Sequence, residues 1–548
     1  MSNPYQEMNQ RWFQAAIEDY KKFLEMLDEP PKTQEELLFN ILKKNQDSEL
    51  GKRYDLQDIK SIEDFQNKIP LSTFEDYHEY VARLMDGEQG LLSGEDVFLL
   101  EPTSGSVGTK FIPMTQSFKE AFQFGINIWF ADLMKGYPGI ENGSHYWSIT
   151  PSVDYKLESK IPVGFDEDSK YLNDDLSGMI SRLAPVPSQV LKIKNGDNFF
   201  YATLLFLITS SDLSFISIWS PTFLLLLLDK ITQYKNFLVE DINNHRFRLP
   251  FDKEEESLFQ SLKTSFESKD YDRDTISSIL FKEKKEYHHL WKNLKVISCW
   301  GDAYAENYID ELKRLFPNTV IQPKGLLATE AFMSIPLKSS KYPVLAVGCH
   351  FYEFRDIDTD NILLVDGLEL GKRYSIIITT QNGFCRYQMR DIIQVVGYYH
   401  NTPMFRFIGK EEKVLDYFGE KVDEVFVDDI FNKIEQQYNI KSNFRAVSCE
   451  KDENDRYSYT FFMESPNDIS DGLKSIIETR VELELLKNVH YQYARRLEQL
   501  KSATFKKVPK GAAGKVMLRH QDKNRIGGIK PFILLNGNDW TKILLSTS

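Results

Sequence analysis

The sequence predicts an α/β protein that is divided into two domains. A chain of 548 residues exceeds what one hydrophobic core normally supports. From about residue 97, short apolar runs bounded by glycine and proline alternate with helical patterns, which is typical of α/β proteins. After Lys410 the pattern changes to a short strand, a glycine turn and a helix. We therefore expect a large N-terminal domain over residues 1–410 and a small α+β domain over residues 411–548.

The N-terminal segment, up to about residue 85, is predicted to be helical, because apolar side chains recur there at helical spacing. Ser72 or Thr73 is the candidate N-cap of a helix whose first turn is acidic. The charge-rich segment 232–286 is also predicted to be helical and solvated.

The most apolar part of the chain is residues 199–231. Asp212 and Pro221 divide it into pieces that are too short to span a bilayer. We predict a buried strand followed by a buried helix here.

Further along, residues 294–300, "LKVISCW", indicate a buried strand. A helical pattern and a second strand follow, so this part forms a strand–helix–strand unit. From Val344, alternating apolar and polar residues with intervening turn residues predict an antiparallel sheet or a barrel.

The composition limits the possible functions. A formal net charge of −14 argues against nucleic-acid binding, although a small anion can still be held by local lysines. The four cysteines are far apart and the nine histidines lack ligand spacing, so we expect neither a disulfide framework nor a histidine metal site. The N-terminus has no apolar signal core. We expect a cytoplasmic protein that does not span a membrane and, without coiled-coil heptads, is a monomer.

The stretch "TSGSVGTK" gathers hydroxyls, glycines and a lysine directly after the apolar run "VFLL". One interpretation is a polar turn between two strands. The other is a loop that wraps a phosphate chain, because glycines allow positive φ and close approach of backbone N–H groups. Under this interpretation Lys110 adds a positive charge, and the loop binds the nucleotide through Thr103, Ser104, Gly105, Ser106 and Gly108.

Four further stretches follow in a fixed order: "GLLATEAFMSIPL" (325–337), "RYQMRDIIQVVGYY" (386–399), "FRFIGKEEKVLDYFGEKVDEVFV" (405–427) and "RIGGIKP" (525–531). Together with the loop, this set resembles the adenylate-forming enzymes, which have a firefly-luciferase-like architecture. Within them the chain resembles the Gretchen Hagen acyl acid–amido synthetase family over nearly its whole length. The versions "GLLATE", "GEKV" and "IGGIKP" look closer to the family's bacterial branch.

The resemblance implies a two-step reaction. A carboxylic acid attacks the α-phosphate of ATP and gives an acyl-adenylate and pyrophosphate, with help from Mg²⁺. An amine, most simply that of an amino acid, then takes the acyl group and releases AMP. The small domain is expected to swing between the two steps. Two alternatives remain open: a ligase that passes the acyl group to a thiol, and a nucleotide-binding or interaction protein without catalysis.

The resemblance also assigns roles on the large domain. Thr329 matches a phosphate-binding hydroxyl, and Glu330 matches the magnesium ligand, since Mg²⁺ is commonly held by one carboxylate, ATP oxygens and water. Asp391 matches the aspartate that accepts hydrogen bonds from both ribose hydroxyls. The alternatives are a helix N-cap at Thr329 and a surface salt bridge from Asp391 to Arg386 or Arg390.

Besides Lys110, four other lysines are candidates. Lys410 lies at the junction of the domains, and Lys421 lies in the first turn of the small domain; both are expected at the nucleotide. Lys530 is the preferred catalytic lysine of the mobile domain, with Lys110 as the other catalytic lysine. Lys515, in "GAAGKVMLRH", is the competitor of Lys530 because thioester-forming relatives have a lysine after a similar glycine.

Three residues depart from the pattern of the family. Ser106 and Val107 stand where the loop usually has threonines, and of the two only Ser106 keeps a hydroxyl. Arg390 stands where a glycine normally precedes the ribose aspartate. An arginine there could clash or could pair with a phosphate. These substitutions favour a specialised or weakened nucleotide site.

Overall fold

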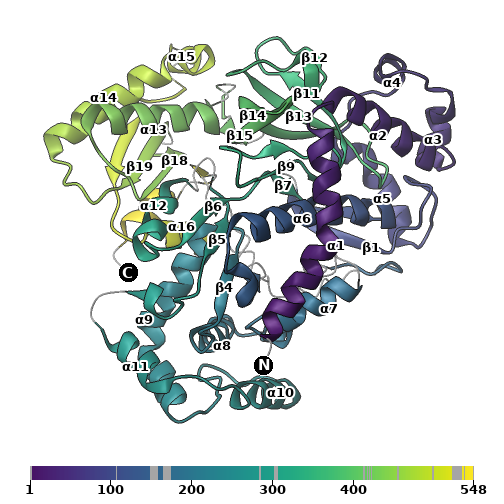
Figure 1. The fold of residues 1–548 in the computed structure, drawn as a ribbon. Coiled ribbons are helices and arrows are strands. Elements are labelled where there is room, and N and C mark those ends of the chain that lie inside the picture. Colours follow the sequence, from purple (N-terminus) through teal and green to yellow (C-terminus); the bar gives the residue numbers. More distant parts are fainter. Residues whose placement is uncertain are drawn as a thin grey trace.

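In the computed structural model the chain forms a large N-terminal part and a smaller C-terminal part (Figure 1). The structure describes residues 3–546, with gaps at 106–107, 148–157, 165–173, 283–285, 302–305, 412–413, 416, 419, 421, 453–455, 497–498, 521–532, 536 and 538.

The N-terminal segment is helical, as predicted. Its helices are α1 (Pro4–Met26), α2 (Pro30–Asn45), α3 (Glu49–Arg53), α4 (Ile62–Lys68) and α5 (His78–Met85). Thr73 is the N-cap of the single turn Phe74–Tyr77 that leads into α5, and its N–H donates to the Asp76 carboxylate at 2.7 Å. Helix α1 packs against α6 (Gln116–Gly136), where the rings of Trp12 and Phe130 stack with centroids 3.6 Å apart.

A four-stranded parallel sheet forms the first centre of the large part. Its order is β3 (Ser144–Trp147), β4 (Leu213–Ser217), β5 (Val296–Cys299) and β6 (Val320–Pro323). Helix α12 (Glu306–Leu315) connects β5 to β6, which confirms the predicted strand–helix–strand unit. The other helices of this region are α7 (Asp174–Leu183), α8 (Gly196–Ile208), α9 (Pro221–Asn243), α10 (Glu256–Glu267) and α11 (Arg273–Phe281).

The prediction for residues 199–231 was wrong in its first half. The run begins with helix α8, and only residues 213–217 form a strand, β4, before α9 follows. Residues 198–208 of α8 are all buried, so their sequence shows no polar face from which a helical period could be read. The helix is nevertheless marked at its start, where the Asn195 side chain accepts from the Asn198 N–H at 2.9 Å.

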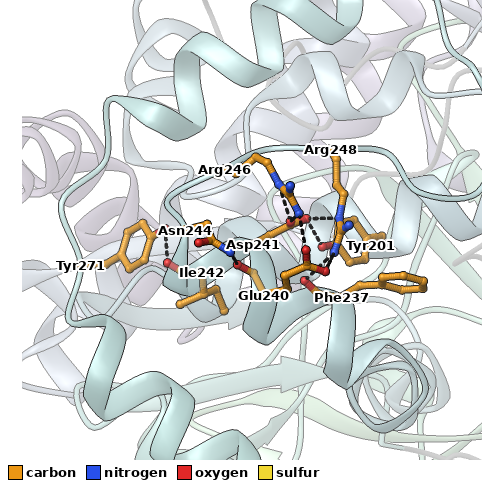
Figure 2. A network of polar contacts seen from close by, with 9 residues as sticks. All are labelled: Tyr201, Phe237, Glu240, Asp241, Ile242, Asn244, Arg246, Arg248 and Tyr271. Carbon is orange, nitrogen blue, oxygen red and sulfur yellow. Dashed lines mark hydrogen bonds and ion pairs between the residues drawn. The ribbon is translucent and has the colours of Figure 1, made fainter.

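The charged segment after α9 is helical as predicted, but it is not merely solvated. Leu262 and Phe266 of α10 are buried in the same hydrophobic core as α8 and α9. At the end of α9 the fully buried Asp241 accepts from Arg246 Nε at 3.1 Å, from Arg248 Nε at 2.8 Å and from the Tyr201 hydroxyl at 2.5 Å. Figure 2 shows the side chains of Arg246 and Arg248 converging on Asp241, so the network ties the segment after α9 to the end of that helix.

A seven-stranded antiparallel sheet forms the second centre, as predicted from Val344 onward. Its order is β12 (Ile362–Leu363), β11 (Phe351–Asp356), β13 (Arg373–Thr379), β14 (Tyr387–Tyr399), β15 (Thr402–Lys410), β10 (Val344–Leu345) and β9 (Ser334–Ile335). Two hairpins lie outside it: β1 (Leu99–Gly105) with β2 (Gly108–Met114), and β7 (Leu327–Ala328) with β8 (Ala331–Phe332).

The C-terminal part begins with the predicted short strands and helix: β16 (Val414–Leu415), β17 (Val422–Asp423) and α13 (Glu424–Tyr438). A four-stranded sheet follows in the order β20 (Thr504–Lys507), β19 (Tyr457–Glu464), β18 (Phe444–Lys451) and β21 (Leu534–Leu535). The remaining helices are α14 (Asp471–Leu485), α15 (Val489–Arg496), α16 (Ala512–His520) and α17 (Trp540–Leu545).

This part has its own hydrophobic core, which also receives two side chains of the large part. Tyr308 of α12 belongs to the core, and Leu225 of α9 packs against both this core and that of the parallel sheet. The two parts are therefore docked on each other through apolar contacts. The exact boundary after residue 410 stays a prediction.

Two further sequence features can be followed in the structure. No helix among the described residues is both long and apolar enough to cross a membrane. All four cysteines are described, and each is a buried free thiol.

Candidate functional site

The hydroxyl- and glycine-rich motif forms the end of the hairpin β1–β2. Thr103 pairs with Lys110, and Gly105 pairs with Gly108 across the hairpin. Ser106 and Val107, between the two strands, lie outside the described residues. The motif thus joins two strands, and this geometry agrees with a polar turn as well as with a phosphate loop.

The ammonium of Lys110 is held near the turn end of this hairpin. Its Nζ donates to the Tyr387 hydroxyl at 3.1 Å and lies 5.7 Å from the ring centroids of both Phe74 and Tyr387. Burial lowers the pKa of Lys110, while the negative charge of Glu330 acts in the opposite direction. Lys110 is therefore a partly desolvated cation with a carboxylate nearby.

Thr329 and Glu330 form the turn between β7 and β8. The alternative of a helix N-cap is wrong, because the residues that follow continue as strand β8 rather than as a helix. The carboxylate of Glu330 is only 8% exposed, and its charge also contributes to a raised pKa of Tyr387, which is due mainly to burial. The hairpin turn thus presents an acidic side chain toward Lys110.

Asp391 lies inside strand β14 and is 2% exposed. It is paired in register with Lys410 of β15, and the Lys410 Nζ lies 3.1 Å from its Oδ1. Although burial opposes the charged ammonium, the nearby carboxylates of Asp391 and Glu330 raise the pKa of Lys410. Lys410 therefore remains charged at neutral pH. Its positive charge interacts with the carboxylates of both Asp391 and Glu330.

The alternative of a surface salt bridge for Asp391 is wrong, because Asp391 is buried and pairs with Lys410. Arg386 instead makes a buried two-pronged ion pair with Glu353, with both N···O distances at 3.0 Å. It also donates to the backbone carbonyl of Ile69 at 2.8 Å. Arg386 thus braces the start of β14 and has a structural role.

The structure brings together four of the predicted residues from three distant parts of the sequence: Lys110, Glu330, Asp391 and Lys410. Lys421 and Lys530 lie outside the described residues. Lys515 lies on α16, and its Nζ contacts the carbonyl oxygens of Ile543 and Ser546 at the end of α17. In this conformation Lys515 is engaged within the small part.

Sequence reasoning missed two further residues. Tyr387, which receives the hydrogen bond of Lys110, stands within one of the quoted motifs. Lys324 follows β6, donates to the Ser217 hydroxyl at 2.8 Å, and has its Nζ 5.3 Å and 4.7 Å from the ring centroids of Trp129 and Trp219. Its signal was a lysine directly after a strand of the parallel sheet, at the edge where α/β sheets bind ligands.

The charges of the cluster fit a magnesium nucleotide. Lys110 and Lys410 supply positive charge for phosphate oxygens, and Asp391 supplies two acceptor oxygens for a diol. Among the described residues, no three side chains of His, Cys, Asp or Glu come together as a metal site. A magnesium ion would therefore depend on Glu330 together with oxygens from the nucleotide and water.

The parallel sheet, the antiparallel sheet that carries the cluster, and the smaller C-terminal part together make up a two-part α/β protein. Two family models match the chain: the GH3 family N-terminal domain over residues 19–321 and the GH3 family central domain over residues 343–410. The chain belongs to the GH3 family.

Named relatives and solved structures agree with this assignment. The indole-3-acetic acid-amido synthetase GH3.2 of Arabidopsis thaliana is 21% identical over 432 residues, which cover 74% of this chain and 78% of that protein. The jasmonoyl–L-amino acid synthetase JAR4 of Nicotiana attenuata is 22% identical over 414 residues, 70% of each chain. The AtGH3.15 acyl acid amido synthetase in complex with 2,4-DB has the same fold, with a TM-score of 0.82, 17% identity and coverage of 97% and 95%.

The predicted family and fold class are therefore confirmed. The predicted class of enzyme, a ligase that forms carbon–nitrogen bonds, is that of these named relatives. The affinity to a bacterial branch stays a prediction, since these relatives are plant proteins.

Proposed function

We propose that this chain is an ATP-dependent acyl acid–amido synthetase, which adenylates a carboxylic acid and transfers the acyl group to an amine. The observation that carries the proposal is the cluster of Lys110, Glu330, Asp391 and Lys410, whose two acidic residues are buried, in a chain of the GH3 family. The relatives named as an indole-3-acetic acid-amido synthetase and as a jasmonoyl–L-amino acid synthetase support the same reaction.

The first half-reaction brings two anions together, so the site must offset negative charge before the acid can attack. Lys110 is positioned for this role because Tyr387 and Phe74 hold its ammonium beside Glu330. The backbone and hydroxyls of the hairpin end, Thr103, Ser104, Gly105, Ser106 and Gly108, supply further donors to the phosphates.

Glu330 and Asp391 orient the nucleotide in this proposal. Asp391 accepts the ribose hydroxyls, and the ion pair with Lys410 keeps its carboxylate in place between two strands. Glu330 holds Mg²⁺, which neutralises phosphate charge when bound, and Thr329 hydrogen-bonds a phosphate oxygen. Lys421 adds charge at the nucleotide, and Lys530 is the catalytic lysine that the small domain brings to the site.

The acid itself is proposed to lie at the carboxyl edge of the parallel sheet. Lys324, Ser217 and the indoles of Trp129 and Trp219 meet there, so an ammonium is available for the carboxylate beside flat apolar surfaces. The substrate classes of this proposal are a small-molecule carboxylic acid and, as for the named jasmonoyl–L-amino acid synthetase, an amino acid.

The test is isotope exchange between pyrophosphate and ATP, with magnesium and a mixed pool of carboxylic acids. We expect exchange in the wild-type protein and at least a hundredfold loss in Lys110→Ala and Asp391→Ala, since loss of one positioned group commonly costs about that much. Lys313→Ala, which removes an exposed lysine of α12, is the matched control.

Each other outcome has a definite meaning. Unchanged exchange in both variants would contradict the site assignment. No exchange in a folded wild-type protein that binds ATP would favour the non-catalytic alternative. Consumption of the adenylate by coenzyme A, but not by amines, would identify a thioester ligase instead.

A further inference from the structure

A row of polar side chains crosses the carboxyl end of the parallel sheet. Trp147 of β3 pairs in register with Ser217 of β4, which in turn pairs with Ser298 of β5. Ser298 pairs with Gln322 of β6. Residues in register on neighbouring parallel strands point to the same face, and the strands lie about 4.8 Å apart, so these four residues form one line, the polar row.

The polar row differs from the rest of the sheet. A parallel sheet that is buried on both faces normally has apolar strands throughout. Two residues earlier on the same face, Phe215 and Val296 are buried in the largest hydrophobic core. On the opposite face, Ile216 and Ile297 belong to the second core. The polar residues are thus confined to one face at the carboxyl end, where α/β sheets bind ligands.

Two members of the polar row have buried hydrogen-bonding groups without a partner. Ser298 is fully buried, and its hydroxyl makes no hydrogen bond to any described residue. The indole N–H of Trp147, a side chain that is 9% exposed, is likewise unpartnered within the part of the chain that the structure describes. Because an unpaired buried polar group costs free energy, two of them in one row indicate that a ligand completes their hydrogen bonds.

The other two members are engaged on one side only. The Ser217 hydroxyl accepts from Lys324 Nζ at 2.8 Å, and Gln322 Oε1 accepts from the Trp129 indole at 3.0 Å. The Trp129 ring also meets the Trp147 ring edge-on, with centroids 5.6 Å apart, so Trp129 packs against both ends of the row. The Nε2 of Gln322 makes no hydrogen bond within the described ranges. The unused groups of the row are therefore two N–H donors and one hydroxyl, and none of them is charged.

Helix α6 connects the polar row to the nucleotide cluster by packing. Trp129 of this helix reaches Gln322, and one turn earlier, about 6 Å along the helix, Gly125 faces the ring of Phe332. A Cβ on Gly125 would lie 2.8–2.9 Å from that ring. Phe332 follows Glu330 by two residues in the hairpin β7–β8, so one helix contacts both the row and the hairpin of the acidic residue.

A second contact joins the same edge of the sheet to strand β15. Trp300, directly after β5, packs on Phe407 of β15 with ring centroids 5.5 Å apart. Strand β15 ends at Lys410, which pairs with Asp391. The polar row therefore lies beside the groups that are proposed to activate the acid.

We propose that the polar row selects the acyl acid by binding an oxygen atom of the acid other than its carboxylate. The inference rests on the proposed function and deepens it, because it names the class of the first substrate: a carboxylic acid that also has a hydroxyl or carbonyl group. Ser298 and Gln322 donate hydrogen bonds to that oxygen. Since the row is uncharged, it suits a neutral oxygen better than a second carboxylate.

The experiment measures pyrophosphate exchange by the full-length protein with matched acids. Benzoic, phenylacetic and hexanoic acids are each compared with their hydroxy derivatives, and hexanoic acid also with its oxo derivatives. Ser298→Ala removes the unpartnered hydroxyl. Ser144→Ala is the matched control, because it removes an equally buried and unpartnered hydroxyl at the amino end of the same sheet. Gln322→Met keeps the length of the side chain but also frees the Trp129 indole, so only the ratio between matched acids is compared for it.

We expect the wild type to prefer the oxygenated member of at least one pair by about tenfold or more in kcat/KM. Ser298→Ala should lower kcat/KM for that acid by about 3- to 10-fold, the usual value of one hydrogen bond between neutral groups, and change the plain acid by less than about twofold. Gln322→Met should lower the same ratio, and Ser144→Ala should leave it unchanged. Ser298→Ala should also be at least as stable to heat as the wild type, because it removes a buried group that lacks a partner.

The opposite results have separate meanings. A wild-type protein that uses plain acids as well as the oxygenated ones in every pair would overturn the inference alone. So would an equal loss with both acids, or no loss with either, in Ser298→Ala, and so would an equal change of the ratio in Ser144→Ala. No exchange with any acid would refute the proposed function, and this inference with it.

Discussion

The buried carboxylate of Asp241 gives a prediction whose magnitude follows from its contacts. Asp241→Asn keeps the shape of the side chain but removes the charge that faces Arg246 and Arg248 (Figure 2). Removing one partner of a buried ion pair costs about 3–5 kcal/mol. The side chains of Arg246 and Arg248 are 44% and 26% exposed, so water can hydrate them when the carboxylate is lost. We therefore expect about 3 kcal/mol, the lower end of that range.

The assay is amide hydrogen exchange in the segment after α9, followed by mass spectrometry. A loss of about 3 kcal/mol in local opening free energy should speed exchange there by about a hundredfold. Peptides from the small domain should exchange as in the wild type, because they do not contact the network. Glu240→Gln is the matched control: Glu240 contacts the same two arginines but is exposed, so its effect should be clearly smaller. Equal effects of the two substitutions, or exchange within threefold of the wild type in Asp241→Asn, would refute the reasoning.

Three other predictions concern the site and the core. Because burial lowers the pKa of Lys110, its ammonium should lose its proton at a pH below the usual lysine pKa of 10.5. The KM for ATP should therefore begin to rise below pH 10.5. Lys110→Arg should flatten this rise, and an equal rise in both proteins would contradict the prediction. A Cβ at Gly125 would lie 2.8–2.9 Å from the Phe332 ring, so Gly125→Ala should lower the thermal midpoint and the affinity for ATP, whereas Gly472→Ala, with open space around it, should do neither. The buried thiols should react with a thiol reagent only after unfolding, since burial raises their pKa, to about 12 for Cys299 and Cys385; rapid labelling of the native protein would refute this.

The parts of the fold that could be predicted from the sequence are those with a clear hydrophobic period or with clear turn residues at their ends. The unit β5–α12–β6 was readable because a short apolar run, an amphipathic helix and a second run follow one another. Helix α8 was missed for the opposite reason: it is buried on all sides, so its composition resembles that of a buried strand. Only Asn195, before its first turn, marked it as a helix.

The residues of the site were predicted better than their contacts. Glu330, Asp391 and Lys110 stand in recognisable motifs, but which residues pair depends on the register of distant strands. The pairing of Asp391 with Lys410 requires β14 and β15 to align as they do, and one residue of shift would separate the two. The left-handed conformation of Arg390 is likewise a property of the folded sheet, and arginine as a residue type gives no hint of it.

The contact of Tyr308 and Leu225 with the core of the small domain has a thermal consequence. If the small domain swings during the reaction, these side chains must leave that core and meet water. Exposing apolar surface raises the heat capacity, and the attraction between such surfaces weakens on cooling. The docked arrangement should therefore become less stable in the cold. The populations of the docked and undocked arrangements during the reaction would then depend on the temperature at which the organism lives.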